Sequence, residues 1–215
     1  MTDRVLYLIR HGRPEYANDD FADTPRGHQY DPPLSDEGAQ QSEALARRLL
    51  LVEPPAAVFT SPLRRARETA LAYTEKAGIG MVEDMDLAEA FIGDWENRSF
   101  EEIIASDGSL LHRFRNHEAF WRHAPGAEDL DAFRERVTRG IERALTMQAE
   151  GNVYVFCHGG VVNAYVAPLF GLEQEMFFLP DNTSVNVLGI DGDRRVVRFL
   201  NDVRHLTDPH LFGQG

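Results

Sequence analysis

The sequence has a single cysteine, Cys157, among its 215 residues. One thiol cannot form an internal disulfide, so a disulfide-stapled fold is excluded and the composition is typical of a reducing compartment. The sequence also lacks a basic leader, and no hydrophobic run reaches the ~20 residues that a membrane-spanning helix needs. We therefore expect a cytoplasmic protein without a membrane partner.

Lysine is nearly absent as well, since Lys76 is the only one and arginines supply the rest of the 22 basic side chains. The formal net charge of -13 disfavours nucleic acid as a partner, because surfaces that bind a phosphate backbone carry clustered basic residues. An anion site in this chain would have to use arginine guanidinium groups, whose paired N–H donors match phosphate oxygens.

Hydrophobic residues make up 43% of the chain, enough for one core, and we expect a single domain over residues 1–215. Apolar runs predict strands at about 5–9, 56–60, 81–85, 153–157, 184–190 and 195–200. Helical spacing predicts helices at about 35–49, 61–77, 99–122, 128–150 and 161–170, with loops at 13–34 and 87–97. This alternation predicts an α/β domain with a mainly parallel sheet and an antiparallel edge strand.

Polar residues follow the carboxyl ends of four expected strands, where ligands bind in open α/β sheets. Arg10 and His11 follow the first strand, Arg65 comes after the second, Glu89 after the third and His158 after the fourth. Phosphoryl transfer needs positive donors for the phosphoryl oxygens, a nucleophile, and an acid for the leaving group. The sequence therefore predicts a phosphoryl-transfer site at this edge of the sheet.

Each of these residues has an expected task. His11 is the candidate nucleophile, because a neutral imidazole can attack phosphorus and give a phosphohistidine that water hydrolyses. Arg10 and Arg65 would hold phosphoryl oxygens, and their charge would help to keep His11 unprotonated. His158 would donate to a further oxygen. Glu89 would protonate the leaving oxygen and later accept a proton from the attacking water.

These segments resemble the histidine phosphatase superfamily, also called phosphoglycerate mutase-like, over about residues 4–205. The resemblance rests on Arg10-His11-Gly12, residues 33–41 and 61–70, Leu87-Ala88-Glu89 with Gly93-Asp94-Trp95-Glu96, His158-Gly159-Gly160, and residues 125–128 and 181–185. It implies a three-layer αβα sandwich and a phosphotransfer enzyme that needs no metal and no cofactor. It also implies a phosphorylated His11, with Arg10, Arg65 and His158 around the phosphate of a small substrate.

Three further residues are predicted to bind the substrate. Gly159 precedes the helix expected at about 161–170, where a backbone amide can donate to an anion. Arg13 lies in the loop that follows His11. The family often has an asparagine six residues after the nucleophile; this chain has Ala17 there, and the adjacent Asn18 is the candidate.

Two other functions stay open beside a phosphatase: a phosphoglycerate-type mutase and a non-catalytic domain that binds phosphorylated ligands. Glycolytic mutases of the family typically carry an inserted basic segment, which is not found around Arg113 and Arg115. A phosphatase is therefore favoured. The substrate stays open, and so does the oligomeric state, for which a homodimer is one candidate.

Other reactive side chains favour structural interpretations. A cysteine phosphatase would need an arginine six residues after Cys157, but Asn163 stands there, so a buried, inert thiol is expected. Arg64 neighbours Arg65 on the same expected helix and should point elsewhere. The spacings of five and six residues between His112, His117 and His123 do not stack them on one helix face, so we expect surface or packing histidines and no metal site there.

Overall fold

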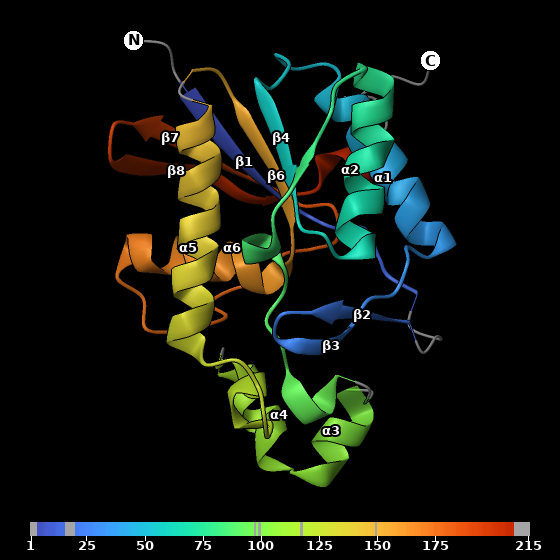
Figure 1. The fold of residues 1–215 in the computed structure, drawn as a ribbon, viewed down its shortest axis with the longest axis vertical. Helices are drawn as coiled ribbons and strands as arrows, with labels where there is room; N and C mark the ends of the chain where they lie inside the picture. Colours follow the sequence, from blue (N-terminus) through green and yellow to red (C-terminus); the bar gives the residue numbers. More distant parts are fainter. Residues whose placement is uncertain are drawn as a thin grey trace.

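The computed structural model describes residues 4–15, 20–96, 98, 100–116, 118–148 and 150–208. Its central sheet has six strands in the order β5-β4-β6-β1-β7-β8 (Figure 1). β5, β4, β6 and β1 run parallel, and β7 pairs antiparallel with both β1 and β8. The bounds are β1 (Arg4–Arg10), β4 (Ala57–Thr60), β5 (Val82–Glu83), β6 (Val153–Cys157), β7 (Val185–Asp191) and β8 (Arg194–Asp202). The expected mainly parallel sheet is confirmed, and its antiparallel edge is the β7–β8 hairpin.

Helices cover both faces of this sheet, which gives the three-layer αβα sandwich (Figure 1). One face is covered by α1 (Asp36–Leu49) and α2 (Arg64–Ala77). The other face is covered by α5 (Leu130–Met147) and α6 (Gly159–Val166). None of the helices that the structure describes combines the length and the apolar character needed to span a bilayer.

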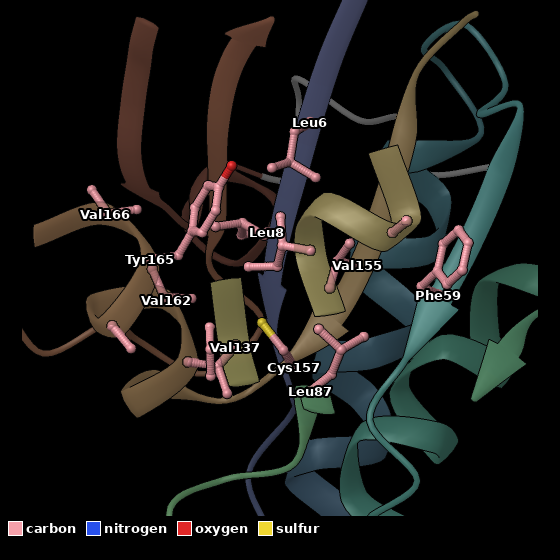
Figure 2. Close-up of a cluster of buried hydrophobic side chains, with 14 of the residues drawn as sticks. Leu6, Leu8, Phe59, Leu87, Val137, Val155, Cys157, Val162, Tyr165 and Val166 are labelled. Carbon is pink, nitrogen blue, oxygen red and sulfur yellow. The ribbon is translucent and has the colours of Figure 1, made fainter. Parts of the chain in front are cut away.

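The two faces of β1 build two separate cores, because successive side chains of a strand point to opposite sides of a sheet. Val5 and Ile9 pack in the core under α1 and α2. Leu6 and Leu8 pack in the core under α5 and α6, and Figure 2 shows the Cys157 sulfur inside this second core. Cys157 is fully buried, and burial raises the pKa of its thiol, which confirms the expected buried cysteine.

Capping residues define the helices on the first face. Ser35 is the N-cap of α1, and its hydroxyl accepts a hydrogen bond from the Gly38 amide at 3.1 Å. α2 begins at Arg64, slightly later than expected, with Leu63 as its N-cap. It ends at Gly78, whose left-handed φ of 66° favours glycine.

A two-stranded hairpin lies inside the segment expected to be a loop, so that prediction was wrong there. β2 (Phe21–Thr24) and β3 (Gly27–Tyr30) pair antiparallel, beyond the carboxyl end of β1 (Figure 1). Strands of four residues are too short to show the alternation of apolar and polar side chains that identifies a strand in a sequence. Contacts with other parts of the fold hold this pair. The buried Gln29 side chain donates to the backbone carbonyls of Glu89 at 3.0 Å and of Ala90 at 3.3 Å.

A group of short helices follows and extends beyond the hairpin (Figure 1). α3 (Phe100–Ser106) and α4 (Ser109–Arg115) lie within the helical segment expected at about 99–122 and are separated at residues 107–108. A small core of their own holds them, made of Trp95, Ile103, Leu110 and Ala124. The remaining short helices are η1 (Met85–Leu87), η2 (Gly93–Trp95), η3 (Phe120–His123), η4 (Ala167–Phe170) and α7 (Arg204–Thr207).

Candidate active site

The carboxyl ends of β1, β4 and β6 meet at one edge of the sheet, as parallel pairing requires. The His11 amide donates to the Cys157 carbonyl at 3.0 Å, and the Ser61 amide donates to the Phe156 carbonyl at 2.9 Å. These bonds continue the parallel ladders by one residue past each strand. They bring the His11 and His158 rings together, with their centroids 5.1 Å apart.

His11 is buried, with 5% of its surface exposed, and its ring has a defined tautomer. Nδ1 lies 2.7 Å from the Gly12 carbonyl oxygen. A carbonyl can only accept, so Nδ1 carries the hydrogen and Nε2 of the neutral ring keeps its lone pair. Burial, followed by the charges of Arg65 and Arg10, holds the pKa of His11 well below its ordinary value. The ring is therefore neutral, with an unprotonated Nε2.

Backbone contacts hold the His11-Gly12 turn in place. The His11 carbonyl accepts hydrogen bonds from the Thr183 amide and from Asn182 Nδ2, both at 3.1 Å. The Gly12 amide donates to Thr69 Oγ1 at 2.9 Å. Sequence reasoning assigned no role to these three residues, although residues 181–185 belong to a segment that resembles the family.

Arg65 and Arg10 reach the histidines from two different elements. Arg65 belongs to α2, is buried to 8% exposure, and its Nη1 donates to the Tyr30 carbonyl at 3.2 Å. Arg10 ends β1, and its guanidinium donates to the Pro180 carbonyl. A Cβ at Gly159 would lie 3.6 Å from Arg10 Nε, so the backbone of the α6 N-terminus is close to this guanidinium.

His158 is fully buried at the start of α6. Its Nε2 lies 2.8 Å from Ser61 Oγ. Burial, followed by the charge of Arg65, holds the pKa of His158 well below its ordinary value, so this ring is neutral too.

Glu89 approaches the same helix N-terminus from the loop after η1. Its Oε2 accepts from the Gly160 amide at 3.0 Å, and a Cβ at position 160 would overlap Oε1. Arg136 of α5 holds the loop by donating to the carbonyls of Glu89 at 2.9 Å and of Ala88 at 2.7 Å. The structure therefore places the predicted carboxylate on the α6 N-terminus, two residues after His158, and an arginine that sequence reasoning did not single out holds its loop.

The predicted substrate-binding side chains are not gathered in this way. Arg13 is exposed and paired with Glu37 of α1 at 2.8 Å, because the chain turns toward the α1 N-terminus directly after Gly12. Asn18 lies outside the described residues. Gly159 is the one of the three that the structure places beside the arginines and histidines.

Arg64, His112 and His123 lie at the surface, in agreement with their structural interpretation. Arg64 is half exposed and bonds Glu68 at 2.7 Å. His112 and His123 are exposed, while His117 lies outside the described residues. Among the residues that the structure describes, no group of three or more His, Cys, Asp or Glu side chains could hold a metal ion.

The αβα fold and the paired histidines and arginines at its sheet edge define a phosphoglycerate mutase-like protein. The chain belongs to the histidine phosphatase superfamily (branch 1), whose sequence profile matches residues 6–203. The family predicted from the sequence is thus confirmed.

Individual relatives are similar over nearly their full length. The adenosylcobalamin/alpha-ribazole phosphatase of Escherichia coli is 31% identical over 200 residues, which cover 91% of this chain and 95% of the relative. The glucosyl-3-phosphoglycerate phosphatase of Mycolicibacterium vanbaalenii is 29% identical over 219 residues, 99% of this chain and 91% of the relative. The solved structure of YhfR from Bacillus stearothermophilus superimposes with a TM-score of 0.80 and 26% identity, over 94% of this chain and 99% of that chain.

Proposed function

We propose that the protein hydrolyses small phosphomonoesters through a phosphohistidine on His11, without a metal ion or cofactor. The observation that carries the proposal is the 2.7 Å hydrogen bond between His11 Nδ1 and the Gly12 carbonyl. It leaves Nε2 as a neutral nucleophile, while Arg10 and Arg65 supply the positive charge. The two relatives named as phosphatases support hydrolysis over transfer to a second substrate.

In the first step, His11 Nε2 attacks the phosphorus of the ester. The new N–P bond forms as the P–O bond to the leaving group breaks, and the protonated carboxyl of Glu89 gives its proton to the departing oxygen. Arg10, Arg65 and His158 hold the three phosphoryl oxygens with their N–H donors, and the Gly159 amide adds a donor at the α6 N-terminus. The products are an alcohol, a Glu89 carboxylate and phosphorylated His11.

In the second step, water attacks the same phosphorus. Glu89, now a carboxylate, takes the proton from the water as the O–P bond forms and the N–P bond breaks. Inorganic phosphate leaves, and neutral His11 and protonated Glu89 are restored. One difficult displacement is thereby divided into two easier ones.

The direct test is turnover of a chromogenic phosphomonoester in the presence and absence of EDTA. We expect equal rates with and without the chelator, and no turnover in the His11→Ala variant. Mass spectrometry after an alkaline quench should show one added phosphoryl group on the wild-type protein and none on the variant. Turnover that disappears with EDTA, or that survives in His11→Ala, would refute the mechanism.

The products formed from 3-phosphoglycerate distinguish the alternatives. Release of inorganic phosphate indicates a hydrolase, whereas formation of 2-phosphoglycerate without phosphate release indicates a mutase. A protein that binds inorganic phosphate but never gains a phosphoryl group would be a binding domain.

A further inference from the structure

Ser61 and His158 form a buried pair that the mechanism above leaves unexplained. Both residues are fully buried, and Ser61 Oγ lies 2.8 Å from His158 Nε2. The same hydroxyl accepts a hydrogen bond from the Leu63 amide at 3.2 Å. Because Ser61 follows β4 and His158 follows β6, the parallel pairing of these strands sets the two residues side by side.

Only one direction of the hydrogen bond between Ser61 and His158 gives the Ser61 hydroxyl hydrogen an acceptor. A serine hydroxyl has one hydrogen to donate and two lone pairs. The Leu63 amide already uses a lone pair, and His158 Nε2 is the acceptor within reach among the described residues. If Nε2 carried the hydrogen instead, the buried hydroxyl hydrogen would have no acceptor there, an arrangement disfavoured by about 1–3 kcal/mol. Ser61 is therefore the donor, and His158 Nε2 accepts.

The tautomer of His158 follows from this direction. In a neutral imidazole one nitrogen accepts and the other carries the hydrogen, so an accepting Nε2 requires Nδ1–H. Nδ1 is buried and has no hydrogen-bond partner among the described residues. The His158 ring also lies directly beside the His11 ring, 5.1 Å between centroids.

We propose that Ser61 is a positioning residue that fixes His158 as the Nδ1–H tautomer, so that the ring presents a donor to the phosphoryl group on His11. The opposite tautomer would present a lone pair to an anionic oxygen and repel it. The second half of this proposal rests on the proposed function, because it takes a phosphoryl group as the acceptor. The first half concerns the free protein alone.

Nitrogen NMR on protein labelled with 15N-histidine tests the tautomer without any turnover. Two-bond proton–nitrogen correlations distinguish a protonated Nδ1 from a protonated Nε2, and comparison with a His158→Gln spectrum assigns the ring. We expect Nδ1 of His158 to be protonated at neutral pH. A protonated Nε2 in the wild-type protein would overturn the proposal.

Addition of inorganic phosphate to the same sample tests the donor. The His158 Nδ1–H signal should shift as phosphate binds, together with the His11 ring signals. A titration that moves the His11 signals and leaves those of His158 unchanged would overturn the role of His158 Nδ1–H as a donor.

Substitution of Ser61 connects the tautomer to the reaction. Ser61→Ala removes the donor, and we expect both tautomers of His158 to appear and kcat to fall about tenfold, with a smaller change in KM. Ser61→Thr keeps a hydroxyl and should restore most of kcat. Ser184→Ala is the matched control, because Ser184 is also fully buried but its hydroxyl has no partner among the described residues.

The two proposals fail in different ways. An unchanged His158 tautomer in Ser61→Ala overturns the positioning role, whatever the activity. A wild-type protein that shows the expected tautomer but never turns over a phosphomonoester overturns the proposed function and leaves the tautomer assignment intact.

Discussion

A single methyl group added at Gly160 should lower the activity of the protein and change its stability little. Its amide donates to Glu89 Oε2 at 3.0 Å, and a Cβ added there would overlap Oε1 and lie 3.0 Å from Cδ. The obstacle is the far end of a flexible side chain, so the carboxylate can swing away while the backbone stays in place. Gly160→Ala should therefore displace Glu89 without unfolding α6.

The expected sizes of the two effects differ widely. A positioned general acid contributes about 10²–10⁴-fold to a rate, so we expect kcat of Gly160→Ala to fall about 100-fold. The free energy of unfolding should fall by only about 1 kcal/mol, because the Gly160 amide loses its Glu89 acceptor while the apolar contacts of the core are kept. The loss should be larger for an alkyl phosphate than for an aryl phosphate, whose leaving oxygen needs less help from an acid.

Steady-state kinetics on both esters, with urea denaturation of each variant, measures these effects. A double-mutant cycle with Glu89→Gln gives the decisive comparison, because two changes that act through one group are not additive. In the Glu89→Gln background, Gly160→Ala should cost less than threefold in kcat. A full 100-fold loss in that background would show that Gly160 does not act through Glu89 and would refute the reasoning.

Two more predictions concern buried polar groups. The Glu96 carboxylate accepts from the amides of Tyr30 and Ile92, both at 2.8 Å, so Glu96→Gln should lower the free energy of urea unfolding by about 2 kcal/mol, since an amide cannot accept at both atoms. Burial, and then the charge of Arg48, lowers the pKa of His205 from 6.5 to about 4. Unfolded chains bind the extra proton, so this group should remove about 3 kcal/mol of stability as pH falls from about 6.5 to 4. In urea unfolding at pH 7 and pH 4.5, the His205→Gln variant should lose less free energy of unfolding than the wild type as the pH falls. Equal losses in the two proteins would contradict this prediction.

The sheet and the positions after its strands could be predicted because both depend on local patterns. Val153–Cys157 is a continuous apolar run, and β6 has those bounds. Once four such runs form parallel strands, their carboxyl ends share one edge of the sheet. His11, Arg65 and His158 could therefore be placed together from the sequence alone. Their spacing along the chain carries no such information without the sheet.

The supporting contacts could not be predicted, because they join residues far apart in the chain. Asn182 reaches the His11 carbonyl across 171 positions, and Arg136 reaches the Glu89 carbonyl across 47. Nothing local distinguishes a buried arginine such as Arg136 from an exposed one such as Arg13. The β2–β3 hairpin could not be predicted for the same reason, since its stability comes from contacts such as those of Gln29 with the Glu89 loop.

The charge of the site's arginines acts on the histidines and, in the proposed reaction, on the substrate. Their field favours neutral rings, and the proposed reaction needs neutral rings, since a protonated His11 has no lone pair at Nε2. The same field attracts an anionic phosphoryl group, in a chain whose net charge of -13 would otherwise repel it. Lysine could supply the charge but not the planar fork that bonds both a backbone carbonyl and a phosphoryl oxygen. The Tyr30 and Pro180 carbonyls hold Arg65 and Arg10 in this way. That geometry accounts for a site built on arginine.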